Sequence, residues 1–170
     1  MRLYPVMTNG SARMLYSVDS SSFMDWQARY YPVDVFANIL YQVDTLIGEG
    51  RFFAPALVKE ELGIVGTGGL IAWGKARSSI FIPTSELIDE AQSIQNRFPG
   101  LRDPKAEFEE ADAYVIALAK VRGGAVITQE TPAAEKRNPK RSHFIPDVCR
   151  EMGVPCFNLL GLMRAEKWQF

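Results

Sequence analysis

Short apolar runs that alternate with segments of helical periodicity are the feature that most constrains the fold of this chain. The apolar runs predict buried strands at residues 14–18, 52–54, 125–128 and 154–159. Helical spacing of apolar residues predicts helices around residues 35–47, 58–62, 87–94, 112–120 and 146–149, with a loop at 66–69. Strands that alternate with helices in this way indicate an α/β protein whose central, mainly parallel sheet is covered on both faces.

Composition narrows the class of protein further. A chain of 170 residues that is 47% hydrophobic predicts one globular domain at residues 14–170. Residues 1–13 show no clear period and are interpreted as an extension or a misassigned start. Cys149 and Cys156 form no CxxC pair, which argues against a disulfide scaffold or a zinc finger. The balance of 19 basic and 20 acidic residues excludes a globally basic nucleic-acid binder. Without a membrane-spanning run or a signal peptide, the expected location is cytoplasmic.

Acidic residues recur where strands end and helices begin. Asp19 closes the first strand, Glu61 lies on the helix after the second, Asp112 opens a helix, and Glu130 follows the strand at 125–128. In an open parallel sheet, ligands bind beyond the carboxyl ends of the strands, so these side chains could meet there. Each also has an ordinary alternative: Asp19 as a helix cap, Asp112 as a complement to the helix dipole, and the glutamates as solvated acids.

Gathered carboxylates point to a bound cation. Two like charges 4 Å apart repel by about 4 kcal/mol at an effective dielectric constant of 20, so a fold that collects four acids normally holds a positive ion. Carboxylate oxygens favour Mg²⁺ or Mn²⁺ over zinc. Such an ion lowers the pKa of a bound water and orients a phosphate, which is the chemistry of phosphodiester hydrolysis.

Four motifs, in this order along the chain, resemble those of PIN-domain nucleases. They are Asp19-Ser20-Ser21-Ser22-Phe23, Val58-Lys59-Glu60-Glu61-Leu62, Glu110-Ala111-Asp112-Ala113 and Thr128-Gln129-Glu130. The segment from Lys140 through Ile145-Pro146-Asp147-Val148-Cys149 to Gly153-Val154-Pro155-Cys156 resembles a prokaryotic, VapC-like branch formerly described as a domain of unknown function. The resemblance covers roughly residues 14–166.

This resemblance implies a three-layer α/β/α PIN-like fold with the acids as its catalytic and metal-binding residues. Asp19, Glu61 and Asp112 would form the acidic core that binds Mg²⁺ or Mn²⁺, with Glu130 as an outer fourth acid. Ser21 would orient Asp19 or a metal-bound water. Two residues depart from the family pattern: Glu130 is one methylene longer than the commoner aspartate, and Ser21 stands where asparagine is more usual.

A basic cluster follows Glu130 and supplies the local positive charge that an RNA-binding protein of near-zero net charge needs. Its members, expected to contact RNA phosphates, are Lys136, Arg137, Lys140 and Arg141. A solvated loop is the alternative. The single histidine, His143, is interpreted as a phosphate donor or a surface residue rather than a general base. Four aromatic residues could stack on bases, contact a protein partner or pack in the core: Trp26, Tyr30, Tyr31 and Trp73.

The function predicted from these features is a metal-dependent endoribonuclease. The resemblance further implies the toxin of a type II toxin–antitoxin pair, with RNA as substrate, a cognate antitoxin as protein partner, a homodimeric assembly and no membrane association. The main alternative is a catalytically inactive PIN-like module that binds RNA or protein. A phosphotransfer enzyme with Asp19 as phosphoacceptor is disfavoured, because Ser21 stands where the haloacid-dehalogenase type needs a second aspartate.

Overall fold

The structure is a computed structural model that describes residues 13–170, and it is built around a parallel five-stranded sheet. All four strand pairings are parallel, as the alternation of strands and helices predicts. The strands, in the spatial order β3-β2-β1-β4-β5, are β1 (Tyr16–Val18), β2 (Phe52–Pro55), β3 (Phe81–Ile82), β4 (Ala125–Ile127) and β5 (Cys156–Phe157).

The strand order places a topological switch point at the centre of the sheet. From β1 the chain builds outward to β2 and β3 on one side, and then returns to place β4 and β5 on the other side. Ser17 pairs with Phe53 in β2 and with Val126 in β4, so β1 is central. Crevices that bind ligands form at such a point, outside the carboxyl ends of the strands.

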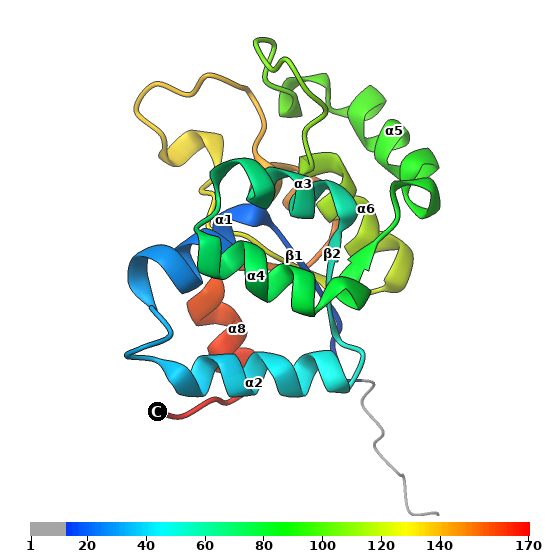
Figure 1. Cartoon of the computed structure of the whole chain (residues 1–170). Helices are drawn as coiled ribbons and strands as arrows, with labels where there is room; N and C mark the ends of the chain where they lie inside the picture. Colours follow the sequence, from blue (N-terminus) through cyan, green and yellow to red (C-terminus); the bar gives the residue numbers. More distant parts are fainter. Residues whose placement is uncertain (1–12) are drawn as a thin grey trace, which may run out of the picture.

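Eight α-helices in the described part of the chain cover the two faces of the sheet, which gives the three-layer α/β/α architecture (Figure 1). The layer of α5, α6 and α7 lies on one face, and α1, α2, α3, α4 and α8 lie on the other. Their bounds are α1 (Ser20–Met24), α2 (Ala37–Gly48), α3 (Ala56–Val65), α4 (Gly68–Ala76), α5 (Ile88–Arg97), α6 (Asp112–Arg122), α7 (Ile145–Met152) and α8 (Leu159–Ala165). Shorter helical segments are η1 (Asp25–Tyr30), η2 (Ser78–Ile80), η3 (Thr84–Glu86), η4 (Pro99–Leu101) and η5 (Ala133–Glu135).

Helix α6 is the centre of its layer. Every residue from Ala113 to Ala119 is buried, because the helix packs on β1, β2 and β4 and is flanked by α5 and α7. Its small alanines allow close approach to the sheet, and the Ser17 hydroxyl donates a hydrogen bond of 2.7 Å to the carbonyl oxygen of Val115. The helix ends at Gly123, whose φ of 66° is the left-handed conformation that favours glycine. This packing fixes Asp112, its first residue, at the carboxyl edge of the sheet.

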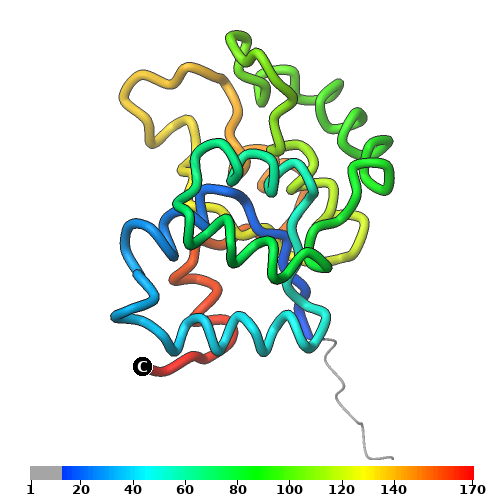
Figure 2. The backbone as a smooth tube through the Cα atoms, in the orientation of Figure 1, coloured from blue at the N-terminus to red at the C-terminus, as the bar shows by residue number. Residues whose placement is uncertain are grey.

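The C-terminal segment packs near α2, at the end of the molecule away from the carboxyl ends of the strands. Figure 2 shows α2 and the last residues of the chain side by side, and residues of both, including Ile39 and Trp168, line one shallow cavity there. At the amino ends of the strands, Arg51 pairs with Glu166, and Glu166 also accepts a hydrogen bond from the Tyr16 hydroxyl. This polar network therefore lies at the far end of β1 from Asp19.

Several elements depart from the sequence-based expectation, among them α1 and α8, which were not expected. The loop expected at 66–69 ends at Thr67, whose hydroxyl accepts a hydrogen bond from the Leu70 amide and starts α4 at Gly68. Strand β3 was not expected, because only two residues pair with β2. The strand expected at 154–159 is shorter, since Asn158 caps α8 by accepting from the Gly161 amide.

Most of the proposed N-terminal extension lies outside the described residues, which begin at Arg13. The Arg13 guanidinium donates to the carboxylate of Glu49 at 2.8 Å. Within residues 13–170, no helix combines the length and the apolar composition needed to cross a membrane.

We predict that Ile116→Ala lowers the free energy of unfolding by about 2–5 kcal/mol, because it leaves a cavity in the fully buried face of α6. Val121→Ala, on the exposed side of the same helix, should change it by no more than about 0.5 kcal/mol. Urea denaturation of both variants measures the difference. Equal effects would contradict the central position assigned to α6.

Candidate active site

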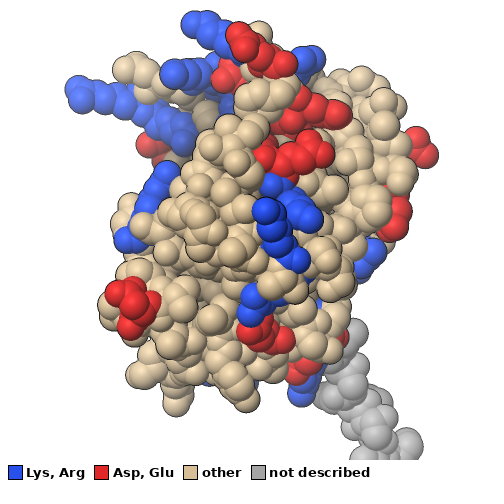
Figure 3. All heavy atoms as spheres, in the orientation of Figure 1, with Lys and Arg blue, Asp and Glu red and all other residues tan. Residues whose placement is uncertain are grey.

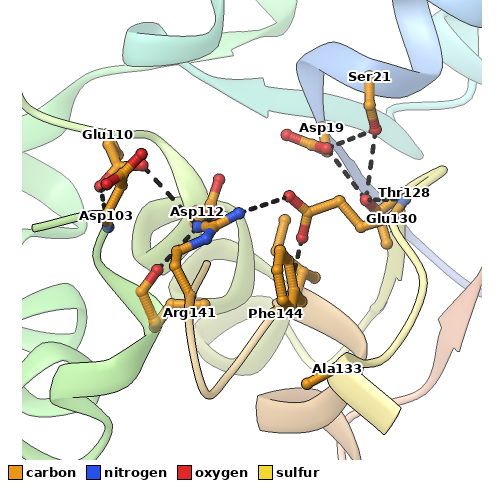
Figure 4. A network of polar contacts seen from close by, with 12 residues as sticks. Asp19, Ser21, Asp103, Glu110, Asp112, Thr128, Glu130, Ala133, Arg141 and Phe144 are labelled. Atoms are coloured by element: carbon orange, nitrogen blue, oxygen red, sulfur yellow. Dashed lines mark hydrogen bonds and ion pairs between the residues drawn. The ribbon is translucent and has the colours of Figure 1, made fainter. Parts of the chain in front are cut away.

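Asp19 is held between β1 and β4 by two hydroxyl groups. Its carboxylate accepts hydrogen bonds from the Ser21 hydroxyl at 2.6 Å and from the Thr128 hydroxyl at 3.0 Å, and only 3% of the residue is exposed (Figure 4). Asp19 occupies the N-cap position of α1, yet its side chain makes no capping hydrogen bond to that helix. The carboxylate is therefore oriented across the switch point, with the Ser21 hydroxyl as one of its donors.

Asp112 enters the same edge from the first turn of α6. Its Oδ2 accepts a hydrogen bond from Nη1 of Arg141 at 2.7 Å. Burial raises the pKa of Asp112 well above its usual range, and the negative charges of Glu130 and Asp19 raise it further, while Arg141 lowers it. Asp112 is thus a buried acid surrounded by other acids, with one arginine as its counter-ion.

Glu130 lies beyond the end of β4 and uses both carboxylate oxygens. Oε1 accepts from Nη2 of Arg141 at 3.1 Å, and Oε2 accepts from the backbone amide of Ile145 at 3.0 Å. Ile145 is the first residue of α7, where a negative charge is favourable to the helix dipole. Burial and the charge of Asp19 raise the pKa of Glu130, whereas the Ile145 amide and Arg141 oppose the shift. Glu130 thus links the Arg141 side chain to the start of α7.

Glu61 approaches the start of α6 from α3. Its Oε1 accepts a hydrogen bond of 3.1 Å from the backbone amide of Ala111, the residue before Asp112. Burial raises the pKa of Glu61, and the charges of Asp19 and Glu110 contribute to the same shift. Glu60, its neighbour, is exposed. Of the two adjacent glutamates, the structure thus places Glu61 at the candidate site.

The four basic residues predicted to bind phosphate divide into two groups. Arg141 points inward and joins Asp112 to Glu130, as Figure 4 shows. The Lys136 ammonium lies 4.3 Å from the centre of the Phe144 ring, and Arg137 and Lys140 are exposed. Figure 3 shows basic side chains along the rim of the molecule at the upper left, over the loop that follows η5. Positive charge at the surface therefore lies next to the buried acids.

The chemistry of these donors fits a divalent cation, although their present conformation does not assemble a coordination sphere. Among residues 13–170, no three side chains of His, Cys, Asp or Glu converge closely enough to hold a metal ion. Asp19, Asp112 and Glu130 nevertheless offer only carboxylate oxygens, which Mg²⁺ and Mn²⁺ prefer. A positive group already lies between two of them, because the Arg141 guanidinium bridges Asp112 and Glu130. The three acids are therefore suited to binding a cation, and the Arg141 side chain provides a positive charge at that position.

Two surface cavities adjoin the acids. One of about 570 Å³ is lined by Asp112, Leu101, Arg102 and the exposed Phe108, together with several glutamates of the 107–110 segment. The other, of about 450 Å³, is lined by Thr128 and Glu130 and extends to Asn158. One cavity thus adjoins Asp112 and the other adjoins Glu130.

Several neighbouring residues have structural roles. Trp26 and Trp73 are buried and pack with Phe23, so they are core residues; Tyr30 remains exposed. His143 packs against the Phe98 ring, with Nε2 at 3.5 Å from Glu151. Asp147 is the third residue of α7, and its Oδ2 accepts hydrogen bonds from the amides of Phe144 and Ala133. It therefore joins η5 to the start of α7.

Sequence reasoning missed the role of Thr128 and the inward orientation of Arg141. Thr128 was part of the Thr128-Gln129-Glu130 motif, which is the signal that could have revealed its contact with Asp19. Its hydroxyl also accepts from the Glu130 amide at 3.1 Å. The Thr128 hydroxyl thus holds the Asp19 carboxylate and the backbone of Glu130 at the same time. Glu110, also quoted in a motif, accepts from the Asp103 amide at 2.8 Å and closes the loop before α6.

The chain belongs to the family described as a domain of unknown function (DUF4411), whose model matches residues 16–170. The match begins at β1 and extends to the last residue, so it contains all the acids and the basic loop described above. None of the curated proteins matches the chain.

We predict that Thr128→Val lowers the free energy of unfolding by about 1–3 kcal/mol, because the nearly isosteric change removes one of the two hydroxyl donors of Asp19 and the hydroxyl acceptor of the Glu130 amide. Thr45→Val, which removes an exposed hydroxyl within α2, is the matched control and should cost no more than about 0.5 kcal/mol. Urea titrations followed by circular dichroism compare the two. A Thr128→Val effect as small as that of the control would contradict the proposed support of the acids.

Proposed function

We propose that this protein is a metal-dependent endoribonuclease that hydrolyses RNA phosphodiester bonds and acts as the toxin of a type II toxin–antitoxin pair. The observation that carries the enzymatic part is the arrangement of Asp19, Asp112 and Glu130 at the switch point of the sheet, around a position that already attracts a cation. The motif resemblance to PIN-domain nucleases supports the choice of RNA and of the toxin role.

Asp19, Glu61 and Asp112 would hold the ion, with Glu130 as the outer fourth acid. A bound Mg²⁺ or Mn²⁺ would supply activation of the attacking water and neutralisation of charge on the phosphate. The hydroxyls of Ser21 and Thr128 keep Asp19 oriented, and Glu61 fixes the backbone just before Asp112. Because burial and repulsion raise the pKa of Asp112 and of Glu130, a nearby cation favours the charged forms of these two acids.

Basic residues on the rim would position the RNA. Arg137 and Lys140 are exposed on the same loop as Arg141, so their side chains can contact backbone phosphates without a rearrangement of that loop. The glutamates that line the larger cavity repel phosphate, which favours a path for the polyanion along the basic loop. The cavities on either side of the acids are consistent with a polymeric substrate.

The second candidate function is a PIN-like module that binds RNA or protein without cleaving it. The ion pairs of Arg141 with Asp112 and Glu130 favour this alternative, because an acid pair neutralised by the chain needs no metal. The cognate antitoxin, a homodimeric assembly and a cytoplasmic location belong to the nuclease proposal and rest on the family resemblance.

Asp19→Asn tests the enzyme proposal. The substitution keeps the shape of the side chain but removes one ligand charge, so RNA cleavage in Mn²⁺ or Mg²⁺ should fall by at least about 100-fold while the fold is retained. Cleavage of mixed single-stranded and structured RNA, with EDTA as the metal-free reference, is the measurement.

Asp34→Asn is the matched control, since Asp34 is exposed in the turn before α2, and it should cleave like the wild type. Wild-type cleavage that persists in EDTA would contradict the metal requirement. Absence of cleavage by folded wild-type protein in both metals would favour the binding module.

Lys140→Ala tests the basic loop. Loss of one phosphate contact should weaken binding of single-stranded RNA and reduce the slope of log affinity against log salt by about 0.7. Titrations in EDTA avoid cleavage during the measurement. Lys75→Ala, on the exposed side of α4, should leave the slope unchanged. A Lys140→Ala slope equal to that of the wild type would show that RNA follows another path.

A further inference from the structure

We propose that Arg141 competes with the divalent ion for the same acids, so that metal binding requires its guanidinium to leave Asp112 and Glu130. This inference rests on the proposed metal-dependent function and assigns to that site a residue that sets its affinity for metal. It makes Arg141 an internal counter-ion of the metal-free protein rather than one more phosphate contact.

The Arg141 guanidinium occupies the space between the acids that would bind the metal ion. Nη1 donates to Oδ2 of Asp112 at 2.7 Å, Nη2 donates to Oε1 of Glu130 at 3.1 Å, and Nη1 also lies 3.8 Å from Oε2 of Glu110. Only 12% of the side chain is exposed, although it belongs to a loop whose neighbours Lys140 and Ser142 are exposed. One guanidinium thus neutralises acids from α6 and from the segment after β4.

The protein holds this guanidinium in place on its other sides. Nη1 donates to the carbonyl oxygen of Leu101 at 2.8 Å, and the guanidinium lies over the Phe144 ring, 4.4 Å from its centre. The backbone beside it is also fixed, because the His143 amide donates to the carbonyl oxygen of Gly100. Gly100 also packs closely on this loop, since a Cβ there would lie 1.8 Å from the Ser142 hydroxyl oxygen and would force the Ser142 side chain to move. The inward position of Arg141 is therefore part of the packed structure.

Arg141 and a metal ion cannot both bind the same carboxylate oxygens of Asp112 and Glu130. Oδ2 of Asp112 and Oε1 of Glu130 are engaged by the guanidinium, and Oε2 of Glu130 accepts from Ile145. A divalent ion that uses either engaged oxygen takes the place of an N–H donor and brings a positive charge next to the arginine. Electrostatic repulsion and loss of the shared oxygens both oppose simultaneous binding. Metal binding must therefore break the Arg141 contacts, and the free energy lost with them weakens the observed affinity for the metal.

Titration of metal-free protein with Mn²⁺ in the absence of RNA, by calorimetry, tests the inference. Arg141→Met removes the competitor while keeping a long apolar side chain next to Phe144, and we expect Mn²⁺ to bind at least about tenfold more tightly than to the wild type. Arg137→Met removes the same charge from an exposed position of the same loop. If long-range charge were the whole effect, the two variants would gain affinity equally, and that result would overturn the proposal.

A second measurement does not depend on the stability of the Arg141→Met variant. In the wild-type protein, Mn²⁺ should increase amide hydrogen exchange in residues 140–143, because release of Arg141 frees the loop from Leu101 and Gly100. Unchanged or reduced exchange at saturating Mn²⁺ would overturn the proposal. Asp19→Asn, which weakens metal binding without touching Arg141, should abolish the increase.

The outcomes separate this inference from the proposed function. Wild-type protein that binds Mn²⁺ and cleaves RNA, with no gain of affinity in Arg141→Met, would overturn the competition and leave the nuclease intact. Mn²⁺ binding to Arg141→Met but not to the wild type supports the competition and explains a wild-type protein that is inactive on its own. Absence of Mn²⁺ binding to both folded proteins overturns the competition and the metal-dependent function together.

Discussion

The mutual repulsion of carboxylates at the carboxyl edge of the sheet is the constraint on which the rest of the candidate site depends. Asp112 is buried and faces the charges of Glu130 and Asp19, all of which raise its pKa. The protein compensates with directed donors: hydroxyls for Asp19, a helix amide for Glu130 and a backbone amide for Glu61. Arg141 adds the only full positive charge that is paired with these acids among the described residues. The loop that precedes α7 places this charge between Asp112 and Glu130.

The same edge explains why a small α/β fold can bring together residues that are distant in the sequence. Strand β1 is central, and its neighbours β2 and β4 lead into segments that carry Glu61 and Glu130. Helix α6 runs back to the start of β4, so its first residue lies with the ends of the strands. The site is thus a consequence of strand order and of the buried packing of α6. A different order of the same strands would separate Asp19 from Glu130.

Local sequence pattern predicted the α/β class and the strongest elements, because their apolar periodicity is continuous. Helix α6 is the clearest case, with seven consecutive buried residues and a glycine at its end. Helix α4 was missed because three of the four residues at 66–69 are glycine, and only the Thr67 cap marks its start. Asp19, Asp112 and Glu130 could be singled out because each stands at a boundary of an element, and Glu61 because it lies in the Val58–Leu62 motif. The orientation of Arg141 could not, since a charge run in a loop does not reveal which side chain turns inward.

The pairing of β1 with β4 also determines when the site can form during synthesis. Ser17 lies next to Val126 in the sheet, so the two strands that bring Asp19 to Thr128 are separated by more than half of the chain. Parallel pairings of such long range form late, because the intervening chain must be ordered first. Arg141 lies still further along the sequence and enters the site only with the loop that precedes α7. A nascent chain on the ribosome therefore lacks the assembled acids until residues 125–130 have emerged, and the Arg141 counter-ion follows them.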